Sequence, residues 1–113
     1  MLANIASIEI PPICETYLEW IKRRPAESLA KYGVDPASAT DRDFFPRLML
    51  GEYFRDQFIY LEELAPVAGI ELTTYEACAV TDIKLTEGRL ELVAQCPNDS
   101  QSYDRVVIAT GHV

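Results

Sequence analysis

The stretch Asp104-Arg105-Val106-Val107-Ile108-Ala109-Thr110-Gly111 is the most informative part of this sequence. Its centre, Val106 to Ala109, is apolar without alternation, which is typical of a strand that is covered on both faces in a parallel α/β sheet. Small residues follow at the carboxyl end of the strand, where open α/β sheets bind their ligands. Gly111 accepts dihedrals that expose its backbone N–H to a phosphate or ribose oxygen. The pattern predicts either a nucleotide-binding turn or a strand that merely ends at a glycine.

The residues before this stretch also have the pattern of strands. Four segments are expected to be extended: 70–75, 78–85, 89–96 and 102–110. Glu87-Gly88 predicts a tight hairpin in which Gly88 supplies the left-handed residue, and Pro97-Asn98-Asp99-Ser100 predicts a further turn. The second half should therefore hold a parallel strand, an antiparallel meander and a terminal parallel strand.

The first half has a helical period instead. Three helices are expected, at 13–24, at 26–32 and from Pro46 to about residue 65, after a short extended segment at 5–10. One apolar stripe of the long helix should face the core, with the members Leu50, Phe54, Phe58, Leu61 and Ala65. The expected fold class is α/β, or α+β if the chain is a fragment. Residues 1–113 would form one partial domain, mainly helical over 1–69 and strand-rich over 70–113.

Composition excludes several classes of function. The chain has 113 residues, 49% of them apolar, which suits one domain with a packed core. Its net charge of −8 argues against binding to nucleic acid, which needs clustered Lys and Arg. The sequence has no apolar run long enough for a membrane span, and its N-terminus lacks the pattern of a signal peptide. We expect a cytoplasmic protein.

Reactive side chains are few. Cys14, Cys78 and Cys96 are widely spaced, and the one histidine is His112. This argues against a zinc site or a dithiol centre, and we expect each cysteine to be a small buried residue in a reducing cytoplasm. The one histidine lies at the end of the chain, which argues against a Ser-His-Asp triad, so no catalytic residue and no metal ligand is assigned.

Several segments together resemble a known family. The meander with Val106 to His112, and the segments Leu2-Ala3-Asn4-Ile5, Pro46-Arg47 and Gly51-Glu52-Tyr53-Phe54-Arg55-Asp56, are similar to bacterial FAD/NAD(P)-binding domain proteins. These are oxidoreductase-like proteins related to flavoproteins with two dinucleotide-binding domains. The resemblance covers nearly the whole chain. It implies an incomplete Rossmann-like domain for FAD, with NAD(P) as a second candidate cofactor.

The resemblance also implies cofactor-binding residues. It places three residues near the adenosine or pyrophosphate part of FAD: Ala109, Thr110 and Gly111. Val80 matches a position whose backbone faces the adenine, and Asn4 resembles a residue on the flavin side. His112 lies either near the cofactor or in solvent, where a lone histidine is more often found.

The sequence departs from the family where the pyrophosphate is normally held. The G-x-G-x-x-G turn is absent, because no two of the five glycines are closer than 18 positions. We therefore expect an internal fragment of a longer protein, contributing the adenosine side of an FAD site and inactive alone. The alternatives are a non-catalytic interaction or binding module of α+β fold, or a stand-alone domain. Expected partners are the rest of the parent polypeptide and a second copy, joined through an exposed strand edge.

Two features of the helical half leave alternatives open. Arg47 lies at a helix start, where the helix dipole disfavours a cation, so it should bind a cofactor phosphate or pair with Glu52 or Asp43; we favour the pair. Five aromatic residues could be mistaken for a flavin-stacking set, but their helical spacing favours a role in the core: Tyr17, Trp20, Tyr53, Phe54 and Phe58.

Overall fold

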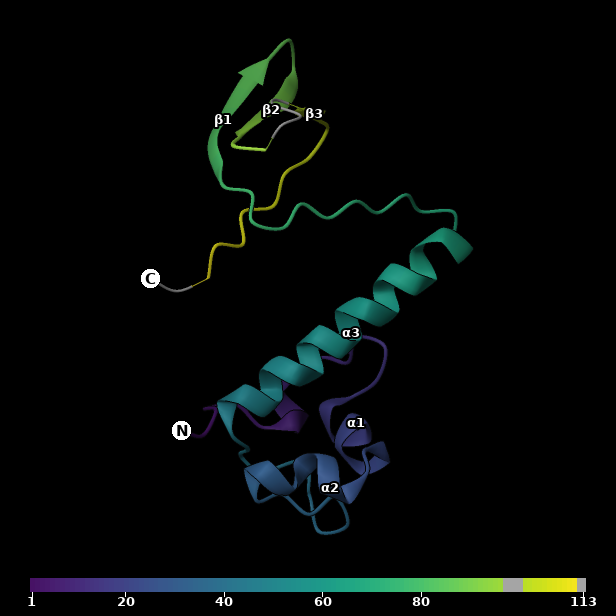
Figure 1. The fold of residues 1–113 in the computed structure, drawn as a ribbon. Helices are drawn as coiled ribbons and strands as arrows, with labels where there is room; N and C mark the ends of the chain where they lie inside the picture. The colour runs from purple at the N-terminus through teal and green to yellow at the C-terminus, as the bar shows by residue number, and fades with distance from the viewer. Residues whose placement is uncertain (97–100, 112–113) are drawn as a thin grey trace. The chain divides into compact units, whose positions relative to one another are not determined.

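The computed structural model describes residues 1–96 and 101–111 (Figure 1). The chain divides into two compact units, Met1–Leu72 and Thr73–Val113. Helices α1 to α3 belong to the first unit, and a three-stranded sheet belongs to the second. The chain is therefore a mixed α+β protein. None of these three helices is both long and apolar enough to cross a membrane.

The first helix, α1 (Tyr17–Arg23), begins later than the predicted residue 13. Thr16 and Glu19 form a capping box, in which the Glu19 N–H donates to Thr16 Oγ1 at 3.1 Å and Thr16 N–H donates to Glu19 Oε1 at 3.1 Å. The N–H groups of Cys14 and Glu15 donate to the Gln57 side chain instead of forming a helical turn. These bonds fix the helix start at Thr16.

The next two short elements differ in how well the sequence predicted them. The segment predicted as a helix at 26–32 is α2 (Ala26–Leu29) followed by a 3-10 turn, Ala30–Tyr32, and Gly33 ends it at φ 70. The extended segment predicted at 5–10 is wrong, because Ser7–Glu9 is a 3-10 turn. Glu9 Oε2 accepts from Ala6 N–H at 2.6 Å and closes this turn.

The long helix, α3 (Arg47–Val67), exists as predicted, with Pro46 as its N-cap. The predicted buried stripe is right at Ala65, which is buried, and in part at Leu50, which packs partly buried against the core, but its other members are displaced by about one residue. Its members Phe54, Phe58 and Leu61 are 43%, 44% and 42% exposed, whereas the stripe that contains Tyr53 and Gln57 is buried. The polar tips of Tyr53 and Gln57 find partners in the 14–15 segment, so these two residues can turn inward.

The core of the first unit combines aromatic and aliphatic side chains, and α1, α2 and α3 all contribute to it. Tyr17 packs against Tyr53 with ring centroids 4.9 Å apart and against Phe45 at 5.7 Å. Trp20 is fully buried beside them. Three of the five aromatic residues considered from sequence are thus core residues, while Phe54 and Phe58 are not.

The second unit is an antiparallel meander. Strands β1 (Val80–Thr86), β2 (Arg89–Ala94) and β3 (Gln101–Tyr103) follow in that order across the sheet. Glu87 at φ 52 and Gly88 at φ 76 make the predicted hairpin turn, since a turn of this kind needs two left-handed residues. The register of β1 shifts between Val80 and Asp82, which indicates a β-bulge at Thr81. The turn predicted at 97–100 lies outside the described residues.

The parallel strands predicted at both ends of the meander are not formed in this structure. Residues 70–75 carry no strand, and the terminal one ends at Tyr103. Val107 and Ile108 are 88% and 72% exposed. A strand exists only where a neighbour pairs with its backbone, and the described residues offer none to these segments. A Rossmann-like sheet is therefore not seen.

Candidate functional site

A cleft of about 520 Å³ in the second unit contains several of the predicted site residues. It is lined by residues 80–83 of β1, by Leu92 of β2 and by residues 106–110. Val80, Ala109 and Thr110 all belong to this lining, although β1 and the terminal segment are far apart in the sequence. The volume lies within the range of small-molecule pockets. The meander produces this arrangement because it carries the chain away from β1 and back again.

Gly111 comes directly after the lining residues and has φ +76. No atom lies within 4 Å of where its Cβ would be, so a larger side chain would fit. Glycine is favoured at this position because of its positive φ. Asn4 is an exposed residue of the first unit, and its expected place on the flavin side stays a prediction. His112 lies outside the described residues.

The polar groups of the cleft are backbone groups, hydroxyls and one carboxylate. Thr81 Oγ1 donates to Val93 O at 3.2 Å and is thus occupied. Asp82 Oδ1 accepts from Ile83 N–H at 2.8 Å, which leaves its second carboxylate oxygen facing no donor among the described residues. Residues 106–110 form no ladder there, so their backbone groups remain able to bond a ligand. The lining contains no Lys or Arg.

This donor set fits one part of a dinucleotide better than the other. An adenine ring suits apolar walls with backbone hydrogen bonds, and a ribose hydroxyl suits a carboxylate acceptor. A pyrophosphate needs cations or a helix N-terminus, and the lining supplies neither. Sequence reasoning missed Asp82; an acid next to the apolar run of a strand was the signal that could have identified it.

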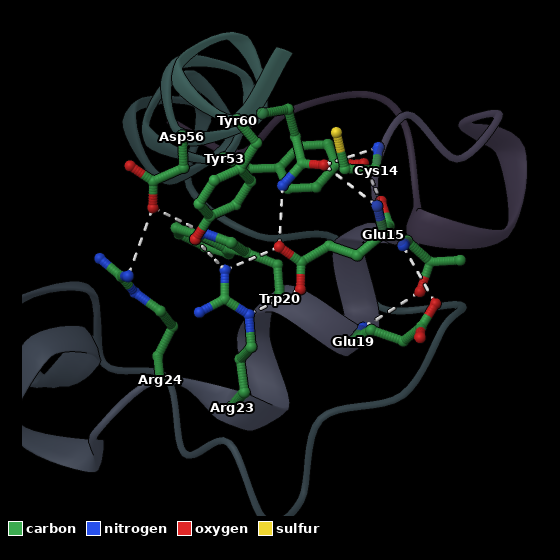
Figure 2. Close-up of polar contacts among 11 residues, drawn as sticks. Cys14, Glu15, Glu19, Trp20, Arg23, Arg24, Tyr53, Asp56 and Tyr60 are labelled. Atoms are coloured by element: carbon green, nitrogen blue, oxygen red, sulfur yellow. Dashed lines mark hydrogen bonds and ion pairs between the residues drawn. The ribbon is translucent and has the colours of Figure 1, made fainter. Parts of the chain in front are cut away.

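A second polar cluster joins α1 to α3 in the first unit (Figure 2). Arg23 donates to Glu15 through two nitrogens, Nε to Oε1 at 2.6 Å and Nη2 to Oε2 at 2.7 Å, and it also contacts the Tyr60 hydroxyl. Gln57 Nε2 donates to Glu15 Oε2 at 2.9 Å, and Tyr53 OH donates to the Glu15 carbonyl at 2.7 Å. The hydrogen bond from Arg23 lowers the pKa of Glu15.

The Gly51–Asp56 segment takes part in the same network. Asp56 Oδ2 accepts from Trp20 Nε1 at 2.8 Å and pairs with Arg24 Nη1 at 3.3 Å (Figure 2). Arg24 also lies 4.8 Å from the centroid of the Trp20 ring. Each carboxylate here is held by a cation, so the cluster fixes the packing of α1 on α3 and offers no paired acid and base.

The pair expected for Arg47 is wrong. Glu52 pairs with Lys31 at 3.2 Å, and the Asp43 carboxylate accepts from Thr40 N–H at 2.9 Å. Arg47 makes no ion pair within residues 1–96 and 101–111, and its side chain is exposed. Its other expected role, contact with a cofactor phosphate, stays a prediction.

The cysteines also differ from expectation. Cys14 is exposed and free, while Cys78 and Cys96 are half-buried and paired as a disulfide, with Cα atoms 5.4 Å apart. The expectation of three separate buried cysteines and no dithiol pair is therefore wrong. Spacing along the sequence could not reveal the pair, because antiparallel strand pairing brings the two residues together.

Two comparisons found known proteins that are similar to this chain. The sequence model of a family described as FAD-NAD(P)-binding matches residues 1–113. The uncharacterized protein YdhS of Escherichia coli (strain K12) is 49% identical over 113 residues, which make up 100% of this chain and 21% of YdhS. The chain thus spans about a fifth of the length of this curated relative. No solved structure matches the chain.

Proposed function

Because this chain belongs to the FAD-NAD(P)-binding family, we propose that it is part of a longer FAD-dependent oxidoreductase and supplies the adenosine side of the FAD site. The observation that carries the proposal is that Val80, Ala109 and Thr110 all line the same cleft. A match to only 21% of the relative's length supports the view that other segments complete the site.

Each lining group has a role in this proposal. Val80 and Ala109 provide apolar contact for the adenine, while the Thr110 hydroxyl and the Gly111 N–H face the ribose or the adjacent phosphate oxygen. The free oxygen of Asp82 accepts a ribose hydroxyl. A bound FAD would supply the redox chemistry through its flavin, and residues of this chain would hold and orient its adenosine end without a catalytic role.

In this proposal, another part of the longer protein binds the pyrophosphate. This chain has no glycine-rich turn, and the described residues that line its cleft include no Lys or Arg. The contacts that remain must offset several kcal/mol of lost translational and rotational freedom. We expect the 113-residue chain alone to show no flavin absorbance close to one FAD per chain. NAD(P) in place of FAD, or beside it, is the second candidate cofactor.

A pair of valine variants tests the site in the longer protein. Val80→Phe fills the cleft, whereas Val67→Phe adds the same bulk at a residue of α3 that is 85% exposed. We expect Val80→Phe to weaken FAD affinity about tenfold, or ~1.4 kcal/mol, and Val67→Phe to leave it unchanged. Flavin absorbance and fluorescence titration measure both. Equal affinities in the two variants, or a longer protein that binds no flavin, would refute the proposal.

The alternative function is a non-catalytic interaction module. It is favoured by the apolar face of α3, where Phe54 and Phe58 are more than two-fifths exposed. A longer protein that binds a macromolecular partner through this face but carries no dinucleotide would support the alternative. We also propose a cytoplasmic location; in that reducing compartment Cys14 would remain a free thiol and the Cys78–Cys96 disulfide would be open to reduction.

A further inference from the structure

Cys78 and Cys96 lie on facing positions just outside the ends of β1 and β2. Val80 pairs with Ala94, and Gln95 N–H donates to Ala79 O at 2.9 Å, so the same register continues to the two cysteines. Their Cα atoms are 5.4 Å apart. This distance lies within the range that a disulfide spans without moving the backbone.

The bulge at Thr81 creates this match. Beyond the bulge, Asp82 pairs with Val93 and Ile83 with Leu92, a register in which position 78 would face position 97. Thr81 adds one residue to β1 and shifts the pairing, so that Cys78 faces Cys96. The Thr81 hydroxyl donates to Val93 O at 3.2 Å and holds the bulge in place. A slip of one residue would turn the two sulfur atoms to opposite faces.

The cysteine pair also forms part of the wall of a hollow of about 250 Å³. At the rim of this hollow, Gln101 Nε2 donates to Tyr75 OH at 2.9 Å, and Tyr103 OH donates to Gln101 Oε1 at 2.6 Å. Cys78 and Cys96 are half-buried and not sealed in a core. A small thiol or disulfide can therefore reach the sulfur atoms from solvent.

We propose that Cys78 and Cys96 form a reversible disulfide by exchange with a low-molecular-weight disulfide such as glutathione disulfide. One cysteine thiolate attacks a sulfur of glutathione disulfide, forming a mixed disulfide and releasing one glutathione thiolate. The second cysteine attacks the protein sulfur of the mixed disulfide, closes the bond between the strands and releases the second glutathione. Two protein thiols are oxidised, one glutathione disulfide is reduced to two thiols, and the two thiol protons pass to the glutathione thiolates.

The disulfide has a consequence for the cleft described above. Val80 is two residues from Cys78 and lines both the hollow and the cleft. A closed disulfide would hold the backbone before Val80 against β2, and reduction would release it. An effect on cofactor affinity rests on the proposed function, whereas the exchange reaction does not.

Tryptic mapping of the full chain tests the exchange directly. The chain is equilibrated with glutathione and glutathione disulfide at several ratios, alkylated with N-ethylmaleimide and digested without reduction. Trypsin cleaves after Lys84 and Arg89, between the two cysteines. Peptides 56–84 and 90–105 should therefore stay joined at oxidising ratios and separate under excess glutathione. Cys14 should be alkylated or carry one glutathione and should never join two peptides, and Cys14→Ser should leave the result unchanged.

Amide exchange gives a second readout in the same protein. The Gln95 N–H, which donates to Ala79 O, should exchange about tenfold more slowly in the oxidised chain than in the reduced chain or in Cys78→Ser. Alkylation of both Cys78 and Cys96 at oxidising ratios would overturn the proposal. So would a disulfide that involves Cys14, or joined peptides that excess glutathione does not separate. Loss of FAD binding in the longer protein would bear on the proposed function alone.

Discussion

Glu15 is a residue on which several polar contacts of the first unit converge. Its carboxylate accepts from Arg23 and Gln57, and its carbonyl accepts from Tyr53. The hydrogen bond with Arg23 lowers the pKa of the Glu15 carboxyl from its ordinary 4.5, and burial opposes this effect without cancelling it. The same contact raises the pKa of the Arg23 guanidinium. The pair ties the start of α1 to its last turn and, through Gln57, to α3.

This lowered pKa predicts how the stability of the first unit depends on pH. Near pH 4.5 the unfolded Glu15 binds more protons than the folded one, so the free energy of unfolding rises with pH there. The contribution should be complete above about pH 5 and should be lost as pH falls through the folded pKa. Urea unfolding can be followed by Trp20, the one tryptophan, which is buried in this unit.

A glutamine scan at two positions isolates the contribution of Glu15. Glu15→Gln should lower stability at neutral pH and flatten its dependence between pH 3 and 5, since a neutral amide keeps the shape but loses the charge. Glu62→Gln, on the exposed face of α3, is the matched control and should change neither. A pH dependence that survives in Glu15→Gln would show that other carboxylates carry the effect; Glu52, whose pKa is also lowered, is the next candidate.

Among the elements, those set by local chemistry were predictable from the sequence. Gly88 marked the hairpin and Gly33 marked the end of the α2 segment, because both positions need a positive φ. The buried face of α3 was not predictable in the same way. Hydrophobicity alone favours Phe54 and Phe58 as buried residues, yet Gln57 is fully buried in their place. Its side-chain amide oxygen accepts from two backbone N–H groups in a distant segment. Such partners are known only once the chain has folded.

The hairpin turn leads to a prediction at the scale of an element. Gly88 has φ +76, and an L-residue in the left-handed region costs roughly 1–2 kcal/mol. Gly88→Ala should therefore destabilise the β1–β2 hairpin by about 1 kcal/mol, measured by amide exchange of the second unit. Gly51→Ala is a control of opposite sign. Gly51 lies inside α3 with open space where a Cβ would be, so the alanine should stabilise that helix by about 1 kcal/mol. A neutral Gly88→Ala would contradict the assigned turn.

For the whole molecule, the sequence correctly separated a helical part from a meander, but it did not predict what the terminal segment would do. The run Val106–Ala109 reads as a buried parallel strand, and its predicted neighbours would have to be strands outside the meander. The described residues provide none, so the segment forms no strand and Val107 and Ile108 are exposed. Whether this segment forms a strand depends on the neighbouring strands with which it can pair, and its own residues do not show whether such strands are present.

The exposed terminal segment leads to a prediction that the 113-residue chain associates with itself in solution. Val107 and Ile108 are 88% and 72% exposed, and unpaired backbone beside apolar side chains can serve as a template for strand pairing. We expect association that increases with protein concentration in sedimentation velocity. Val107→Lys should weaken it, because a charge on a pairing segment opposes edge-to-edge contact. Val67→Lys is the matched control, since Val67 is 85% exposed at the end of α3 and outside any strand. A strict monomer at high concentration would contradict this prediction. Equal effects of the two lysines would exclude the terminal segment as the contact and leave the apolar face of α3 as the surface to test next.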